Sequence, residues 1–429
     1  MMELLKKIAP LHRTLACNAT DQALRILAEH VPGSVIEGFP TSTRVWSWDI
    51  PKRWELDRAS IRRKNGEVLV DADWNHLHVL NYSIAFSGVV SHDELMAHLH
   101  SHPGQPEAIP FSFSFYEPKW GFCVPHAWRE RFVDEEYIVE IESRFEDGSL
   151  NVLSKLLPGE SEQTFVICAD ICHPLQVNDS LTGVAAAVEI MHFLEVLPKR
   201  KYSYLLLVVP ETIGSIAYLA HHPEVIEKAV GGLFSEMLGT TGNLVGQRTR
   251  RGDTYWDRLL TAVLAESGCE HKVVDFMKSA SNDEKVLDSP GVDIPTFSLT
   301  RYPYPEYHTS DDNIALIDAD KLRESTAILR KVIEWAEYDY IPVLNQPGPV
   351  FLSGNGLFPD WRADPTLLPY WQSYVEVMNS LDNRHSLVQL ATAKNIPLSH
   401  FRYWTEAFQG KGLMSTKPFH VNKPLAENL

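Results

Sequence analysis

The sequence lacks a long hydrophobic run. No window of about 18 apolar residues occurs, and a helix that crosses a membrane needs roughly that many. The amino terminus also lacks the apolar segment and the small-residue cleavage site that together mark a secretory signal. We therefore expect a soluble, cytoplasmic protein with no membrane partner.

Cysteine is also scarce, with five residues in a chain of 429. An odd number of scattered cysteines without a secretory signal indicates reduced thiols rather than disulfides. Cys168 and Cys172 are four positions apart, which is not the spacing of a zinc knuckle, so we interpret both as structural. The remaining cysteines are Cys17, Cys123 and Cys269.

Basic residues are in deficit: 39 Lys and Arg stand against 56 Asp and Glu, for a formal net charge of −17. Nucleic-acid phosphates are bound by clustered Lys and Arg, so this balance argues against nucleic acid as the main partner. Three motifs are missing as well: a Gly-x-Ser-x-Gly elbow, a phosphate-binding loop and a glycine-rich dinucleotide fingerprint. Serine-hydrolase, nucleotide-hydrolysing and dinucleotide-dependent chemistries therefore fit the sequence poorly.

Two regions differ in their hydrophobic patterns. Residues 46–149 carry short alternating runs bounded by turn dipeptides, which predicts a β-rich region. Its many aromatic residues either fill a small β core, the interpretation we favour, or form a wall on which a sugar or peptide stacks. Residues 1–45 and 150–340 form the second region, with one helix near the amino terminus and then alternating strand and helix patterns.

The alternation over 150–340 predicts a mostly parallel sheet covered by helices on both faces. Binding sites in such sheets form beyond the carboxyl ends of the strands. The expected strands are 164–169, 202–209, 232–237 and 296–299. The expected helices are 181–196, 214–229, 253–267 and 319–337.

The carboxyl-terminal segment, 346–429, predicts a winged-helix domain. Helices are expected at 365–380, 386–394 and 398–409, followed by a hairpin that ends near Val421. Positive and negative residues are nearly balanced here, and the second helix of the motif offers Arg402 alone as a basic side chain for a DNA groove. We therefore favour a docking module that binds a protein partner or forms a homo-oligomer.

Chemically informative residues follow the expected strands. His173 and Asp179 lie on one loop after the first strand, and Glu211 follows Pro210 at the end of the second. Glu236 interrupts an apolar strand, where an unpaired carboxylate would be costly to bury. His308 lies in an aromatic loop after the last strand.

Each of these residues has an ordinary explanation when it is taken alone. Asp179 is also a typical helix cap, and Glu211 is also a typical first-turn acid beside a helix dipole. Together, however, two histidines and three carboxylates at strand ends are the nitrogen and oxygen ligands that zinc accepts. The pattern therefore predicts a site for one or two zinc ions, with a nearby Glu to take a proton from water.

At this point the residues resemble the co-catalytic zinc aminopeptidases. The matching positions are His173, Asp179, Glu236 and His308. A closer resemblance covers nearly the whole chain and is to aminopeptidase-like proteins often encoded in polysaccharide and secondary-metabolite gene clusters, which implies the β-rich insertion and the winged helix. Its motifs begin at Trp48, Leu77, Trp120, Ile171, Pro210 and Pro305.

The sequence departs from the parent family at its pair of glutamates, because Glu211 is followed by Thr212. Glu211 is then either a metal ligand, which we favour at this stage, or the general base. In the first case the base would come from Asp283 or Glu284. A site for one zinc ion, held by Asp179, Glu211 and His308, is a further alternative.

The resemblance implies a zinc-dependent hydrolase that cleaves an amide bond next to a free amine in a small peptide-like or aminoacyl substrate. One alternative is a deacylase of an aminoacylated metabolite or sugar. Another is a catalytically silent scaffold that carries a winged-helix interaction module.

Overall fold

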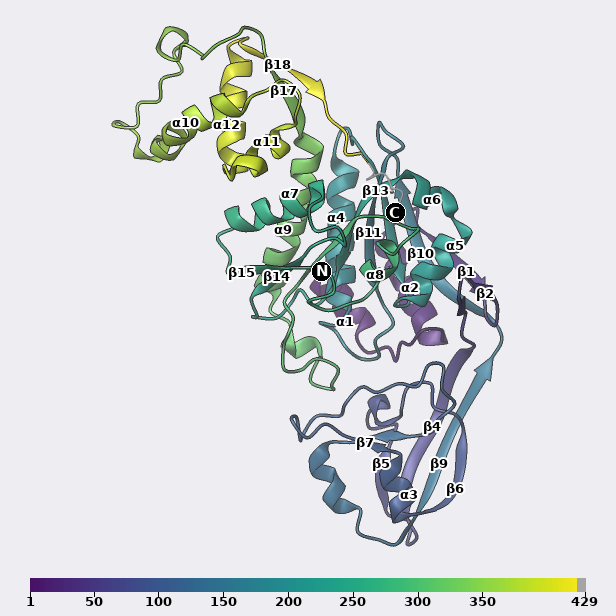
Figure 1. Ribbon diagram of the computed structural model, residues 1–429. Coiled ribbons are helices and arrows are strands. Elements are labelled where there is room, and N and C mark those ends of the chain that lie inside the picture. The colour runs from purple at the N-terminus through teal and green to yellow at the C-terminus, as the bar shows by residue number, and fades with distance from the viewer. Residues whose placement is uncertain (423–429) are drawn as a thin grey trace.

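The computed structural model describes residues 1–422, so the end of the predicted winged-helix segment, 423–429, lies outside the described residues. Its largest feature is an eight-stranded sheet at the centre of the molecule (Figure 1). In spatial order the strands are β1 (Val35–Pro40), β10 (Ser149–Leu157), β12 (Ser203–Val209), β11 (Thr164–Asp170), β13 (Ala229–Ser235), β16 (Thr296–Thr300), β14 (Leu244–Gln247) and β15 (His271–Val274).

The middle of this sheet is parallel. Strands β12, β11, β13 and β16 run in one direction, whereas β10 pairs antiparallel with β12, and β14 pairs antiparallel with β16. Every residue of β11, β12 and β13 is buried, as expected for strands covered on both faces. The predicted fold class, an α/β fold with a mostly parallel sheet, is confirmed.

Helices cover both faces of the sheet. They are α1 (Met2–Ile8), α2 (Asn18–His30), α4 (Leu181–Val196), α5 (Ile213–His221), α6 (Pro223–Lys228), α7 (Tyr255–Glu266), α8 (Glu284–Leu287) and α9 (Ala319–Tyr338). Alternate residues of β11 join different cores: Phe165 and Ile167 pack into one cluster, and Val166 and Cys168 into the other. The sheet therefore separates two hydrophobic cores, as its period of two requires.

The predicted helix 214–229 is two helices. Pro223 begins α6, because a proline has no backbone N–H to continue the preceding helix. His222 lies at the break, with its Nε2 2.8 Å from Glu37 Oε2 and its Nδ1 3.0 Å from Glu224 Oε1. The histidine thus joins the edge strand β1 to the start of α6.

This junction predicts a pH-dependent stability. Burial acts to lower the pKa of His222, but the hydrogen bonds to Glu37 and Glu224 outweigh it and raise the pKa above 6.5. The protonated histidine therefore stabilises the fold below about pH 6.5, and the contribution is lost as the pH rises through the higher folded pKa. We expect His222→Gln to lower the free energy of unfolding by about 0.5–1 kcal/mol near pH 5.5 and by less near pH 8.5, since water screens these half-buried groups. Urea unfolding at both pH values measures the difference, and an equal loss at both would contradict the assignment.

A second, antiparallel sheet lies apart from the central one and projects from one end of the molecule (Figure 1). Its strands, in order, are β5 (Val68–Asp71), β4 (Arg53–Arg63), β9 (Glu136–Glu146) and β6 (Phe86–Ser91). Shorter elements of the same region are β2 (Arg44–Val45), β3 (Trp48–Asp49), α3 (His92–Ala97), β7 (Leu99–His100) and β8 (Phe122–Cys123). Trp54 and Trp120 are buried in this region, whereas Trp46, Trp48 and Trp74 are exposed.

The carboxyl-terminal segment lies at the opposite end and contains α10 (Leu368–Ser380), α11 (Leu387–Lys394) and α12 (Leu398–Gly410). The hairpin expected before Val421 is wrong: β18 (Met414–Pro418) pairs antiparallel with β17 (Tyr340–Leu344), which directly follows α9. Glu266 at the end of α7 accepts backbone hydrogen bonds from Leu398 and Ser399, so the core caps α12. The winged-helix assignment itself stays a prediction.

None of the helices in the described residues is both long enough and apolar enough to cross a membrane.

Candidate metal centre

The predicted metal ligands gather beyond the carboxyl ends of the parallel strands. His173 follows β11, Glu211 follows β12, Glu236 directly follows β13, and His308 lies on the loop between β16 and α9. Parallel strands end at a common edge, so residues far apart in sequence come together there.

Asp179 lies between the two histidines. Its Oδ1 is 3.8 Å from His173 Nδ1, and its Oδ2 is 3.2 Å from His308 Nε2. The centroids of the two imidazole rings are 5.6 Å apart. One ligand atom from each of these three residues lies within 4.8 Å of the others, a spacing that one shared ion can span.

The polar atoms at the centre of this group lack hydrogen-bond partners. They are His173 Nδ1, both carboxylate oxygens of Asp179, and His308 Nε2, and all are buried. Buried polar atoms without partners are costly, and natural proteins leave few of them. These atoms converge on one point, so the residues fit a bound divalent cation.

The charges of the centre also favour a cation. Burial raises the pKa of Glu236 well above its ordinary value, and the carboxylates of Asp179 and Asp170 raise it further. Burial lowers the pKa of His173, but the neighbouring carboxylates, led by Asp179, outweigh it, so the pKa lies above its ordinary value. The crowded acids therefore draw positive charge to this position, which a metal ion would supply.

Asp170, the last residue of β11, belongs to the centre although our sequence analysis missed it. Its Oδ2 is 3.1 Å from His173 Nδ1, the residue is fully buried, and neither carboxylate oxygen has a hydrogen-bond partner. Asp170 approaches the same ring nitrogen of His173 that faces Asp179, so it adds a further carboxylate next to the position of a cation. The available signal was an acid at the end of a buried strand, three positions before the histidine.

Cys172 lies beside the same histidine. One possible ligand atom from each of Asp170, Cys172 and His173 lies within 4.8 Å of the other two. Burial is the largest cause that raises the pKa of Cys172, to about 11, so the group is a neutral thiol near pH 7. Its Sγ accepts a hydrogen bond of 3.2 Å from the backbone N–H of Glu211. The thiol therefore holds the loop that carries Glu211.

Two buried charged residues hold the loop that carries His173 and Asp179. Asp312 accepts hydrogen bonds from the backbone N–H groups of residues 177–179 and from the hydroxyl of Tyr304. Arg13, on the other side, donates to the carbonyl oxygens of Ile171, His173 and Gln176. The loop is thus held from two sides, by Arg13 before α2 and by Asp312 before α9.

Glu236 is near the centre but is not part of the group of ligand atoms within 4.8 Å. Its Oε2 accepts a hydrogen bond from the side chain of Asn282, and the residue is buried. Its assignment as a ligand stays a prediction.

The candidate bases differ in their access to solvent. Asp283 accepts hydrogen bonds from the backbone N–H of Thr212 and the hydroxyl of Ser215, and Glu284 accepts one from Gln247; both acids are buried. Burial raises the pKa of Glu284 to about 7. Glu211 has 26% of its side chain exposed, and its Oε2 is 3.7 Å from His173 Nε2.

The inserted region forms one wall of the centre. The ring of Phe111 lies edge-on to both histidines, with centroid distances of 5.7 Å to His173 and 5.2 Å to His308. The backbone N–H of Phe111 donates to the carbonyl oxygen of His308 at 2.8 Å. The insertion is therefore attached directly to the loop that carries the second histidine.

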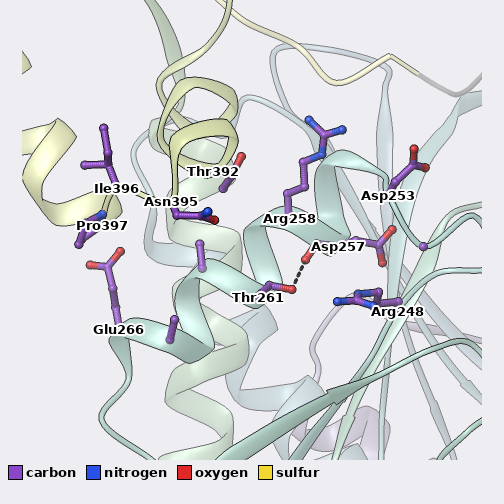
Figure 2. Close-up of a pocket in the computed structure, with 13 residues that line it drawn as sticks. Arg248, Asp253, Asp257, Arg258, Thr261, Glu266, Thr392, Asn395, Ile396 and Pro397 are labelled. Atoms are coloured by element: carbon purple, nitrogen blue, oxygen red, sulfur yellow. Dashed lines mark hydrogen bonds between the residues drawn. The ribbon is translucent and has the colours of Figure 1, made fainter. Parts of the chain in front are cut away.

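A separate cavity of about 490 Å³ lies between α7 and the turn that joins α11 to α12 (Figure 2). No histidine or cysteine lines it. Two of its three acids are already engaged, because Asp257 accepts hydrogen bonds from Thr249 and Thr254 and Glu266 caps α12; the third is Asp253. This cavity therefore offers no histidine or cysteine ligand, and none of its residues belongs to the groups that could hold a metal ion among the described residues.

Residues 2–339 match the family model described as Domain of unknown function (DUF4910). The chain belongs to this family. The DUF4910 chain is 32% identical, over 415 residues, to a Clostridium acetobutylicum protein described as a candidate polysaccharide biosynthesis protein with an aminopeptidase-like domain; the match covers 94% of this chain and 93% of the relative.

Solved structures extend the comparison. The DUF4910 chain resembles a candidate peptidase from Clostridium acetobutylicum with a TM-score of 0.85 at 30% identity, covering 97% of this chain and 96% of that one. It resembles a zinc aminopeptidase from Bacillus subtilis with a TM-score of 0.59 at 12% identity, covering 78% and 94%. The second likeness shows a shared fold, and the predicted membership of an aminopeptidase-like family is confirmed.

Proposed function

We propose that this DUF4910 protein is a zinc-dependent hydrolase that cleaves an amide bond next to a free amine in a small peptide-like or aminoacyl substrate. The observation that carries the proposal is the convergence of unpartnered ligand atoms from His173, Asp179 and His308. The fold supports the proposal as well, because a solved structure with a similar fold is described as a zinc aminopeptidase.

His173, Asp179 and His308 would hold the zinc ion, and Asp170 would add negative charge beside the same nitrogen of His173. When bound, zinc acts as a Lewis acid that polarises a carbonyl group and makes water more acidic. The ring of Phe111 covers one side of both histidines, whereas the side chain of His308 keeps 27% of its surface exposed, which leaves the centre open to substrate and water.

Glu211 is the residue we assign as general base, a change from the ligand role favoured by the sequence. Burial is the largest cause that raises its pKa, and a base with a raised pKa both accepts and returns a proton more readily near neutral pH. Lys285 Nζ lies 3.6 Å from Glu211 Oε1, which leaves Oε2 to face the site. Oε2 takes a proton from water as the water oxygen bonds to the carbonyl carbon, and it passes that proton to the nitrogen as the C–N bond breaks.

Asp283 and Glu284 then have positioning roles. The hydrogen bonds from Thr212 and Ser215 to Asp283 fix the first turn of α5 directly after Glu211. Glu284 and Gln247 bind each other beneath that turn. Neither acid needs to meet the substrate in this arrangement.

The test uses zinc-loaded protein and a panel of aminoacyl amides and dipeptides. Glu211→Gln is expected to lower kcat by about 10²–10⁴-fold while zinc content stays unchanged, because the amide keeps the shape but cannot accept a proton. Glu270→Gln, an exposed acid outside the centre, is the matched control. Undiminished turnover in Glu211→Gln would refute the assignment of the base, and a wild-type chain that takes up no zinc would refute the proposed function.

A further inference from the structure

The inserted region and the second histidine share a cavity. It has a volume of about 490 Å³ and is lined by residues 99–102, 110–112 and 307–309 together with Arg129. His308 lines this cavity and also belongs to the metal centre. The cavity therefore adjoins the position at which a scissile bond would lie.

Backbone hydrogen bonds fasten the two walls of the cavity to each other. The backbone N–H of Ser310 donates to Ile109 at 2.8 Å, and the N–H of Ile109 donates to the hydroxyl of Ser310 at 3.0 Å. The bond from Phe111 to His308 continues this pairing. Two backbone hydrogen bonds and one to the hydroxyl of Ser310 thus hold the inserted region against the loop that carries His308.

Arg129 is the one lining residue of this cavity with a permanent charge; the lining histidines are titratable. Its Nη1 donates to the carbonyl oxygen of Leu99 at 2.8 Å, and its Nη2 contacts Met96 Sδ at 3.4 Å. Within residues 1–422 its guanidinium has no carboxylate partner and its Nε–H has no hydrogen-bond acceptor, although the chain as a whole is rich in acids. Nη1 also lies 3.5 Å from the hydroxyl of Ser101, so both Nη atoms contact neutral groups and the positive charge is left without a counter-charge, which favours binding of an anion.

Two polar groups beside Arg129, His100 and Ser101, add no charge near pH 7. Burial lowers the pKa of His100, and His98, Lys119 and Arg129 lower it further, so His100 is neutral near pH 7. Ser101 is already paired with His126 at 3.0 Å. A single guanidinium as the one permanent charge of the lining matches the single charge and planar shape of a carboxylate better than the higher charge of a phosphate.

We propose that this cavity is a subsite in which Arg129 binds a carboxylate group of the substrate. The inference rests on the proposed function and narrows its substrate class to amides that carry a free carboxylate, such as a peptide or an aminoacyl amino acid. The acids of the metal centre would repel such a group, and the charge of Arg129 offsets that repulsion at the cavity. Arg129 is thus a binding residue that selects the substrate.

The experiment measures binding with probes that cannot be hydrolysed. The probes are the analogue of alanylalanine with CH₂–NH in place of the amide, its carboxamide form, and its phosphonate form, titrated calorimetrically into zinc-loaded protein. We expect wild-type protein to bind the carboxylate at least about tenfold more tightly than the carboxamide, since a charged hydrogen bond to Arg is lost in the latter. Arg129→Gln should bring that ratio close to one, with zinc content and melting temperature unchanged.

Arg131→Gln is the matched control, because Arg131 stacks on Trp128 outside the cavity and should keep the preference. Equal or undetectable binding of the carboxylate and the carboxamide to wild-type protein would overturn the subsite, and so would a preference that survives in Arg129→Gln. Tightest binding of the phosphonate would overturn the choice of a carboxylate. A chain that hydrolyses dipeptides and their amides equally well would refute the subsite alone, whereas a chain that takes up no zinc would refute the proposed function.

Discussion

Asp179→Asn is expected to abolish zinc binding and hydrolysis together. Both oxygens of Asp179 face a histidine, neither has a hydrogen-bond partner, and the residue is 1% exposed. The substitution keeps the shape of the side chain but removes the negative charge that lies between His173 and His308. Loss of a supporting residue around a metal typically costs about 10–100-fold in affinity, so loss of this central ligand should cost at least about 100-fold.

Zinc affinity is measured by competition with a chromophoric chelator, and the melting temperature is recorded with and without zinc. Wild-type protein should be stabilised by zinc, because a ligand that binds only the folded chain shifts the unfolding equilibrium, whereas Asp179→Asn should not respond. Asp311→Asn is the matched control, since Asp311 is an exposed acid on the loop that follows His308. Wild-type zinc affinity in Asp179→Asn would show that the ion, if bound, is held elsewhere.

Of the substitutions proposed here, Arg13→Met is expected to lower the free energy of unfolding most. Arg13 is fully buried, and its guanidinium donates to the carbonyl oxygens of Ile8, Ile171, His173 and Gln176. Burial lowers the pKa of Arg13 to about 10, so the side chain stays charged at neutral pH. Methionine fills a similar volume but leaves these acceptors unpaired, and each buried unpaired group costs about 1–3 kcal/mol.

We expect the free energy of unfolding to fall by about 3 kcal/mol or more, which corresponds to a melting temperature lower by about 6 °C or more for a domain of this size. Zinc affinity should weaken as well, since the loop before Asp179 loses one of its two anchors. Arg25→Met on the exposed face of α2 is the control and should change the melting temperature little. A melting temperature unchanged in Arg13→Met would mean that the loop is held by Asp312 alone.

Local patterns were sufficient to predict the central layer. The strands before His173 and Glu211 are short apolar runs, and segments with helical periodicity separate them in the sequence. Helix α4 begins and ends at the residues that its sequence pattern predicts. The grouping of the candidate metal ligands followed from a rule of topology, because parallel strands end at one edge. The sequence therefore placed His173, Asp179 and His308 together without any coordinates.

Residues whose roles depend on distant contacts were not predictable in this way. Arg13 is separated by 160 positions from the carbonyl of His173 that it binds, and arginine is ordinarily exposed, so no local pattern marks it. Asp312 was visible only as part of a motif, without its role in holding the loop of Asp179. Likewise the partner of β18 is β17, far back in the chain, whereas a local pattern favours a hairpin with the nearest neighbour.

An antiparallel β-bridge joins Pro110 of the inserted region to Thr309, directly after His308, so the inserted region holds the loop that carries this histidine. A shortened α/β fragment without the inserted region would lose both the ring of Phe111 beside the site and the backbone contacts to the loop that carries His308. Shortened versions of the chain should therefore retain the inserted region, because it contacts the loop that carries His308 in the candidate metal centre.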